Sequence, residues 1–275
     1  MNIITFPGLN LEFNISRVAI KIFGIEIYWY AILMVGAMII AICMFKKRDG
    51  LYNIKFSEIL DLSIYLIPIS LISARLYYIL FNLEYYISSP SQILNTRNGG
   101  MAIYGGIIGG AITCFVFCKK RKINILDLID YIVPGLVLGQ AIGRWGNFIN
   151  VEAYGTQTNL PWRMGIVEAG KYVEVHPTFL YESLACLAIF IILLILKNKR
   201  KFKGQIACVY LILYSFERTF VEGLRTDSLR IGNIRVSQML SIIILIICLA
   251  IYVVKILKIS INENKNKKTK ITAKK

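Results

Sequence analysis

Residues 139–155 read GQAIGRWGNFINVEAYG and follow directly after an apolar run. Five polar or charged side chains stand within thirteen of these residues: Gln140, Arg144, Asn147, Asn150 and Glu152. A charged residue at the centre of a membrane-spanning helix costs about 2.5–3.5 kcal/mol, whereas each large apolar residue returns only about 0.3–0.6 kcal/mol. Such a cluster in an apolar context therefore predicts a membrane-embedded functional site that contains Arg144.

The composition of the 275-residue chain indicates a membrane protein. Apolar residues make up 56% and the mean hydropathy is +0.61, whereas soluble domains are usually about half apolar. The net charge of +16 is spread over short basic runs between apolar segments, which is typical of cytoplasmic loops and not of a nucleic-acid surface. We expect no nucleic-acid partner and no removable signal peptide.

Seven segments are long and apolar enough to cross a bilayer, which needs about 20 residues. They are 25–45, 59–83, 101–118, 126–148, 178–197, 205–224 and 236–257. Basic residues concentrate in alternate connections and at the C-terminal end. The sequence therefore predicts an all-α polytopic protein with seven transmembrane helices, its N-terminus outside and its C-terminus in the cytoplasm.

The expected organisation has three parts. Residues 1–24 form an N-terminal outer segment, and residues 25–258 form the membrane domain. Within that domain, the connection 150–177 is an outer loop or a small cap. The lysine-rich residues 259–275 form a cytoplasmic tail, which we expect to be solvated and disordered over most of its length.

This topology brings polar residues of six segments to one depth. Arg75, Arg144 and Arg218 fall near the outer ends of outward-running spans, at a rise of about 1.5 Å per residue. Tyr30, Tyr104 and His176 stand at the starts of inward-running spans. We therefore expect a shared polar cavity that opens outward.

Helical spacing adds local detail and leaves alternatives open. Tyr214, Arg218 and Glu222 share one helix face, with Arg225 a turn beyond. Arg218 and Glu222 could equally form a structural ion pair, Arg75 could extend to the lipid headgroups, and His176 could simply begin a helix. Residues 28–30 could be an interfacial aromatic belt. Arg144 has no acidic neighbour before Glu152, so an anionic ligand could supply its partner.

The available chemistry favours phosphate binding. The chain has no GxSxG, HExxH or Walker sequence and a single histidine, which argues against a metal hydrolase or a Ser-His-Asp enzyme. Its six cysteines all lie in apolar runs, as buried hydrophobic residues do. Arginine is the preferred side chain for phosphate because it donates paired, charge-assisted hydrogen bonds. An anionic phospholipid is the plainest ligand for such a site.

Several stretches resemble the signature sequences of the prolipoprotein diacylglyceryl transferase family. The first is GRWGNFINVEAYG at 143–155. The others occur in family order: IYWYAI at 27–32, SARLYYILFN at 73–82, GGMAIYGGIIGG at 99–110, HPTFLYE at 176–182, YSFERTFVEGLR at 214–225 and SQMLS at 237–241. The resemblance thus spans nearly the whole chain, and it is specific because it does not depend on one motif.

The resemblance implies a bacterial enzyme of the cytoplasmic (inner) membrane with its active site toward the extracytoplasmic side. It would transfer the sn-1,2-diacylglyceryl group of phosphatidylglycerol to the lipobox cysteine of a prolipoprotein signal peptide, and release glycerol phosphate. No metal or other cofactor is expected. The thiol must lose its proton, since a free cysteine has a pKa of about 8.5.

The resemblance also implies roles for individual residues. Arg144 and Asn147 match the headgroup-binding signature. Arg218 matches an essential arginine, and its neighbours Tyr214, Glu222 and Arg225 match positions expected to bind phosphatidylglycerol. Tyr30, Arg75 and Glu152 match other polar positions and are expected to bind phosphatidylglycerol. The expected catalytic residues are Arg144, Arg218, Tyr104 and His176.

The general base stays open. Many members of the family have histidine at the position of Tyr104, and a phenol with a pKa of about 10 is a poor base at neutral pH. Either Tyr104 orients the phosphate, or arginines lower the pKa of the thiol directly, or His176 accepts the proton.

A transporter or channel for an anionic solute is the alternative function. It would use the same arginines as a vestibule and would need polar residues in the inner halves of the spans. The inner stretches 36–45 and 190–196 are strongly apolar, which favours the enzyme.

Overall fold

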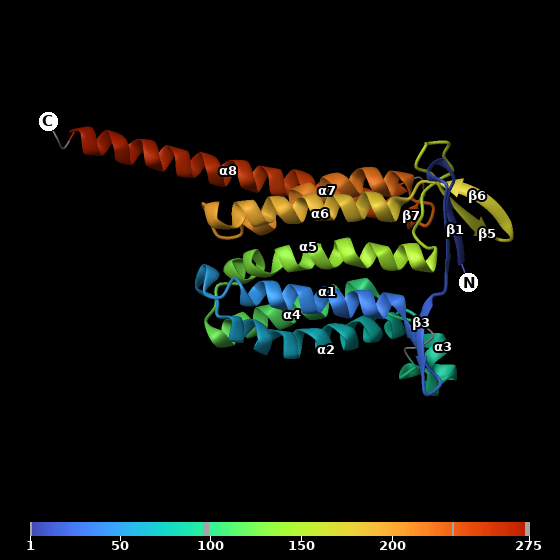
Figure 1. Ribbon diagram of the computed structural model, residues 1–275. Helices are drawn as coiled ribbons and strands as arrows, with labels where there is room; N and C mark the ends of the chain where they lie inside the picture. Colours follow the sequence, from blue (N-terminus) through green and yellow to red (C-terminus); the bar gives the residue numbers. More distant parts are fainter. Residues whose placement is uncertain (1, 96–98, 233, 273–275) are drawn as a thin grey trace. The chain divides into compact units, whose positions relative to one another are not determined.

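The computed structural model describes residues 2–95, 99–232 and 234–272, with side chains as far as residue 263. Within these ranges seven helices have 18 residues or more (Figure 1). They are α1 (Trp29–Lys46), α2 (Phe56–Leu80), α4 (Ile103–Arg121), α5 (Ile125–Asn150), α6 (Thr178–Leu196), α7 (Gln205–Leu224) and α8 (Val236–Thr272). Each helix overlaps one of the segments predicted to span a membrane.

Six of these helices are long and apolar enough to cross a membrane, so the described chain has the build of a multi-pass membrane protein. Helix α7 is not among the six, because it carries Glu217, Arg218 and Glu222 in its last turns. The mostly helical, polytopic architecture is confirmed. The count of seven spans and the direction in which each one crosses remain predictions.

The chain divides into two compact units. One comprises Met1–Met44 with Ile132–Lys275, and the other comprises Phe45–Tyr131. The first unit holds α6 to α8, all the strands, and most of α1 and α5. The second unit holds α2, the short helix α3 (Leu83–Ser88) and α4.

In the second unit, glycine lets α2 and α4 approach closely. A Cβ atom at Gly105 would lie 2.4 Å from the backbone oxygen of Ser73, which is well inside contact distance. The backbone N–H of Ala102 donates to the carbonyl of Ala74 at 3.1 Å and fixes the start of α4 beside α2. The glycine stripe at 105–110 is therefore a packing feature in this unit.

In the first unit, α5, α6 and α7 alternate in direction and bring three helix ends together. The Oγ of Ser183 on α6 donates to the carbonyl of Ala141 on α5 at 2.8 Å, and the indole of Trp145 donates to that Oγ at 3.2 Å. On the other side, α7 packs along α8. The tail, for which we expected disorder, continues α8 as a helix as far as Thr272, and residues 273–275 lie outside the described part.

A four-stranded antiparallel sheet, which the all-α prediction lacked, stands at these helix ends. Its order is β2 (Leu11–Ile15), β1 (Asn2–Phe6), β5 (Met164–Glu168) and β6 (Lys171–Val175). Thus the N-terminal segment and the connection after α5 build one sheet. Two hairpins complete the strands: β3 (Val18–Ile22) with β4 (Ile25–Tyr28), and β7 (Arg230–Ile231) with β8 (Ile234–Arg235).

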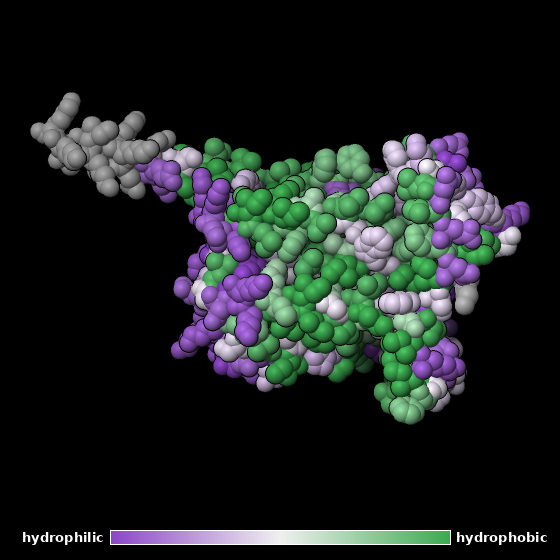
Figure 2. All heavy atoms as spheres, viewed as in Figure 1, coloured by the Kyte–Doolittle hydropathy of each residue, from purple (hydrophilic) through white to green (hydrophobic). Residues whose placement is uncertain are grey.

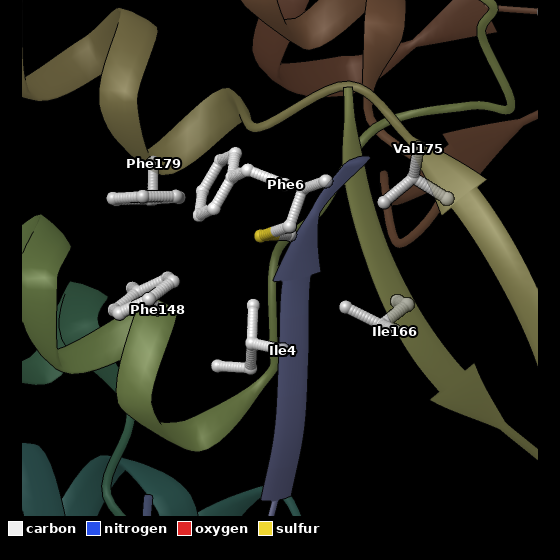
Figure 3. Close-up of a cluster of buried hydrophobic side chains, with 7 residues drawn as sticks. Ile4, Phe6, Phe148, Ile166, Val175 and Phe179 are labelled. Atoms are coloured by element: carbon white, nitrogen blue, oxygen red, sulfur yellow. The ribbon is translucent and has the colours of Figure 1, made fainter. Parts of the chain in front are cut away.

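The inner face of the sheet packs on α5 and α6. Ile4 and Ile166 are fully buried against Phe148 of α5 and Phe179 of α6 (Figure 3). The rings of Phe148 and Phe179 lie 4.6 Å apart between centroids. This aromatic core attaches the sheet to the two helix ends that carry Arg144 and Glu182.

Candidate active site

Five charged residues converge where α5 ends, α6 begins and α7 ends. Arg144 precedes the last residue of α5 by six positions, and Glu182 is the fifth residue of α6. Arg218 and Glu222 occupy the last two turns of α7, and Arg225 follows that helix directly. The antiparallel helices thus bring residues 144, 182 and 218 to one end of the first unit.

Glu182 is the centre of this cluster. One carboxylate oxygen, Oε2, lies 2.5 Å from Nη2 of Arg144 and 2.9 Å from Nη1 of Arg218. The other, Oε1, lies 3.6 Å from Nη1 of Arg225. The Glu182 side chain is only 1% exposed, so its charge is held out of water by three guanidinium groups.

Two further carboxylates, those of Glu222 and Asp227, pair with Arg218 and Arg225. Nη2 of Arg218 lies 2.5 Å from Oε2 of Glu222, one turn along α7. Arg225 forms a two-pronged contact with Asp227, in which Nε donates to Oδ1 at 2.9 Å and Nη2 donates to Oδ2 at 2.8 Å. The pair of Arg218 and Glu222 left open by helical spacing therefore exists, inside a larger network.

Arg144 has no acidic neighbour before Glu152 in the sequence, and the structure supplies a partner, Glu182, from another helix. Sequence reasoning omitted Glu182 from the site, although its signal was available. A carboxylate in an apolar segment is as costly as an arginine there and is by default functional or paired. Glu217 meets the same criterion: both of its carboxylate oxygens are buried and have no hydrogen-bond partner among the residues that the structure describes.

Asn147 and Glu152 extend the cluster along α5. Nη1 of Arg144 donates to Oδ1 of Asn147 at 3.4 Å, and Nδ2 of Asn147 donates to Oε1 of Glu152 at 2.8 Å. Asn150 donates to the same oxygen at 3.4 Å. The predicted residues of this stretch therefore form one chain of polar contacts that starts at Arg144.

Two tyrosines line the cluster. The ring of Tyr30 packs on Gly146, where a Cβ would lie 2.2 Å from a ring carbon. Tyr214 is stacked on Tyr210 with 5.5 Å between ring centroids, and it interacts electrostatically with Arg144 and Arg218. Both predicted tyrosines of the first unit are thus next to the α5 and α7 residues of the site.

His176 lies beside the site in a connecting segment. Its Nδ1 is 3.3 Å from the hydroxyl of Tyr181, and its backbone N–H donates to the carbonyl of Thr156 at 3.0 Å. Burial lowers the pKa of His176, so the imidazole is neutral at neutral pH. No contact between His176 and the arginines is seen in the described residues.

Arg75 belongs to the second unit, and backbone carbonyls occupy its donors. Its Nε donates to Ile93, its Nη1 donates to Gly99 and Gly100, and its Nη2 donates to Gln92 and Asn95, over distances of 2.7 to 3.0 Å. The guanidinium also lies over the ring of Tyr86 at 5.2 Å. With 8% exposure and its N–H groups donated to these carbonyls, Arg75 holds the segment before α4 and presents no free fork to a phosphate.

Tyr104 is the second residue of α4 and is about half exposed. Tyr104 belongs to the second unit. Arg144, Arg218 and Arg225, which together form the arginine cluster, belong to the first. The carbonyls held by Arg75 immediately precede this helix. In the described residues, no group of three or more His, Cys, Asp or Glu side chains is arranged to hold a metal ion.

The sequence profile described as prolipoprotein diacylglyceryl transferase matches residues 17–254. This chain belongs to the prolipoprotein diacylglyceryl transferase family. The match includes every residue of the arginine cluster. The segments that carry the resemblance, 143–155, 176–182 and 214–225, are those that meet around Glu182.

Several relatives match most of this chain in sequence. One from Finegoldia magna is 51% identical over 232 residues, which is 84% of this chain and 92% of the relative. One from Clostridioides difficile is 49% identical over 228 residues, 83% and 90% of the two chains. One from Lactococcus lactis is 40% identical over 259 residues, 92% and 98% of the two chains. All three are named phosphatidylglycerol–prolipoprotein diacylglyceryl transferase.

Proposed function

We propose that the chain transfers the sn-1,2-diacylglyceryl group of phosphatidylglycerol to the lipobox cysteine of a prolipoprotein signal peptide. The cysteine sulfur attacks the glyceryl carbon, a thioether forms, and the carbon–oxygen bond to the phosphate breaks. The thiol proton leaves and glycerol phosphate is released. The observation that carries this proposal is the convergence of Arg144, Arg218 and Arg225 on one buried carboxylate.

The arginines suit the charge that develops during this reaction. The leaving phosphate oxygen gains negative charge, and one preorganised donor aimed at such an oxygen is typically worth about 3–4 kcal/mol. Each guanidinium has five N–H groups, and the carboxylates use only some of them. The three side chains are 13 to 19% exposed, which leaves donors accessible to a phosphate.

Glu182 fits a positioning role in this proposal. Three cations at one site repel one another, and a buried carboxylate between them offsets that repulsion. Because Glu182 contacts all three, it also sets their spacing before a lipid arrives. Asn147, Glu152, Glu222, Tyr30 and Tyr214 are proposed to contact or orient the phosphatidylglycerol headgroup around the three arginines.

The thiol proton has two possible routes: direct stabilisation of the thiolate by the arginines, or transfer to His176. Arginines beside the substrate sulfur favour the thiolate and lower the pKa of the thiol. His176 is neutral and able to accept a proton, but it is engaged with Tyr181. We propose the arginine route first, in which Arg144, Arg218 and Arg225 lower the pKa of the thiol directly.

We further propose that the protein lies in the bacterial cytoplasmic membrane with the arginine cluster toward the extracytoplasmic side. The sheet at the cluster end would then lie outside the membrane. A transporter for anionic solutes would need polar side chains along the helices. In the described part of α6, the buried residues beyond Glu182 are Ser183, Cys186, Ile189 and Leu193, an increasingly apolar series that supports the transferase.

A reconstituted assay tests this function. Purified protein in phosphatidylglycerol vesicles is incubated with a lipobox peptide, and the mass of the peptide is measured. We expect the gain of one diacylglyceryl group, and we expect Arg144→Ala to reduce the rate at least about a hundredfold, as loss of a preorganised donor does.

The matched control is Arg121→Gln, which removes an arginine paired with Asp61 at 2.6 Å on an exposed surface of the second unit. Exposed pairs contribute little to stability, about 0–1 kcal/mol, so this variant should transfer normally. An unmodified peptide together with anion flux across the vesicles would instead support the transporter.

A further inference from the structure

The β3–β4 hairpin has one apolar face and one polar face. Ile20 pairs with Ile27 and Ile22 pairs with Ile25, while Lys21 pairs with Glu26 between them. Directly paired residues project to the same side of a sheet, and successive residues alternate. The four isoleucines therefore share one face. Lys21 and Glu26 share the other, with Nζ and Oε1 3.7 Å apart.

The apolar face is uncovered. Ile20, Ile22 and Ile25 are each about half exposed, and Phe23 at the tip is 100% exposed. Both turn residues have positive φ, 49° at Phe23 and 81° at Gly24, as a tight two-residue hairpin turn requires. The space-filling view shows apolar atoms along this hairpin, which carries the label β3 in Figure 1 (Figure 2).

The base of the hairpin is fixed at the end of the first unit that carries the arginine cluster. The backbone N–H of Trp29, the first residue of α1, donates to the carbonyl of Arg17 at 3.1 Å. Nη2 of Arg17 donates to the carbonyl of Asn150, the last residue of α5, at 2.8 Å. Hairpin, start of α1 and end of α5 are thus tied together.

Membrane depth follows from this attachment. Helix α1 is a candidate membrane span, and Tyr28, Trp29 and Tyr30 at its start are all exposed, as residues of an interfacial aromatic belt are. Phe23 is six residues from Trp29, which is at most about 20 Å of extended chain. The apolar face is therefore within reach of the lipid headgroups, and it continues the exposed apolar surface of α1.

The hairpin suits the lipid interface and not the hydrocarbon core. Among the described residues, β3 and β4 pair only with each other, so both edges keep unpaired N–H and C=O groups that hydrocarbon excludes. The ion pair between Lys21 and Glu26 also needs a hydrated side. An amphipathic element of this kind lies flat, with its apolar face in the boundary between headgroups and acyl chains.

We propose that the β3–β4 hairpin is an interfacial membrane anchor. Its occupant is the phospholipid leaflet at the arginine-cluster end, with Ile20, Ile22, Phe23 and Ile25 against the acyl chains and the pair of Lys21 and Glu26 toward water. This anchor is separate from the transfer reaction. It would hold the start of α1, and with it Tyr30, at a fixed depth in that leaflet.

The test uses the full chain in phosphatidylglycerol vesicles with Phe23→Trp as a reporter. The wild-type spectrum, which contains Trp29, Trp145 and Trp162, is subtracted. We expect blue-shifted emission that is quenched by lipids brominated near the carbonyl end of the acyl chain, and quenched less by lipids brominated near the methyl end.

The matched reporter is Val167→Trp, an exposed apolar position on β5. The Phe23→Trp reporter should show about twice its fractional bromine quenching, as interfacial insertion implies. Red-shifted emission from the Phe23→Trp reporter that is quenched by acrylamide but not by brominated lipid would overturn the proposal of a membrane anchor. A blue shift that depends on protein concentration in detergent would assign the face to a second copy of the chain. A blue shift that appears only with lipobox peptide would assign it to the substrate. Either result would also overturn the proposal.

Discussion

Glu182 offsets the mutual repulsion of three arginine side chains in the first unit. It contacts Arg144, Arg218 and Arg225 while it is nearly inaccessible to water. All three arginines are predictable from the sequence because charges in apolar segments are conspicuous. Their common partner is not, because the pairing joins residues 36 to 43 positions apart in different segments, which no local pattern reveals.

Neutralising Glu182 should weaken both stability and transfer. Glu182→Gln keeps the shape of the side chain but leaves three partly buried arginines without their shared counter-charge. Removing one partner of a buried ion pair typically costs about 3–5 kcal/mol. We expect a lower unfolding temperature in detergent and a lower kcat. An unchanged unfolding temperature and rate would show that Glu182 is dispensable.

Substituting Arg75 tests whether this residue holds the loop before α4 or binds the lipid. Lysine has three donors on one atom and cannot span five carbonyls. We expect Arg75→Lys to speed hydrogen exchange around Gly99 and Gly100 and to lower kcat, with the KM for phosphatidylglycerol changed less than about threefold. A large rise in the KM for phosphatidylglycerol, with unchanged hydrogen exchange, would show instead that Arg75 binds the lipid.

At the scale of elements, two adjacent glycines on α4 differ in what surrounds them. A Cβ at Gly105 would lie 2.4 Å from the backbone oxygen of Ser73, whereas a Cβ at Gly106 would meet its nearest atom at 3.6 Å. Overpacking of this kind costs about 1–3 kcal/mol. Gly105→Ala should therefore lower the unfolding temperature, which differential scanning measures directly.

Gly106→Ala is the matched control for that variant. Alanine favours a helix interior by about 1 kcal/mol over glycine, and it fits the space at this position. Its unfolding temperature should be unchanged or higher. Equal losses in both variants would mean that α2 and α4 do not approach as closely as described.

The helices were predictable and the strands were not. A run of about 20 apolar residues is a strong local signal, and all seven long helices lie where the sequence indicated. The strands are five residues or shorter, and β1 pairs with β5 through Ile4 and Ile166, 162 positions apart. Only the assembled fold shows that residues 2–6 and 164–175 share a sheet.

For the whole molecule, acidification should reduce stability in two steps. Burial lowers the pKa of His176 below its ordinary 6.5, so the unfolded chain takes up this proton first and stability falls as pH drops below about 6.5. The hydrogen bond from Arg225 lowers the pKa of Asp227 below 3.8, so a second loss follows below about pH 4. Unfolding temperatures measured from pH 8 to pH 3 would show both steps.

His176→Asn should remove the first step and leave the second. The variant keeps a polar side chain beside Tyr181 without a group that titrates near neutral pH. An identical profile from pH 7 to pH 5 in both proteins would mean that His176 titrates normally in the folded state.

Gly155, the last residue of the stretch 139–155, has a consequence for how this protein can diverge. Its N–H donates to the carbonyl of His176, the N–H of Thr156 donates to Leu224, and residue 155 bridges to Arg225. Main-chain atoms make these bonds, so most side chains in this segment can be substituted during evolution without losing them. Gly155 is the exception, because a Cβ there would lie 2.7 Å from the Cβ of His176. A larger residue would therefore separate the ends of α5, α6 and α7, which carry the charged residues of the site.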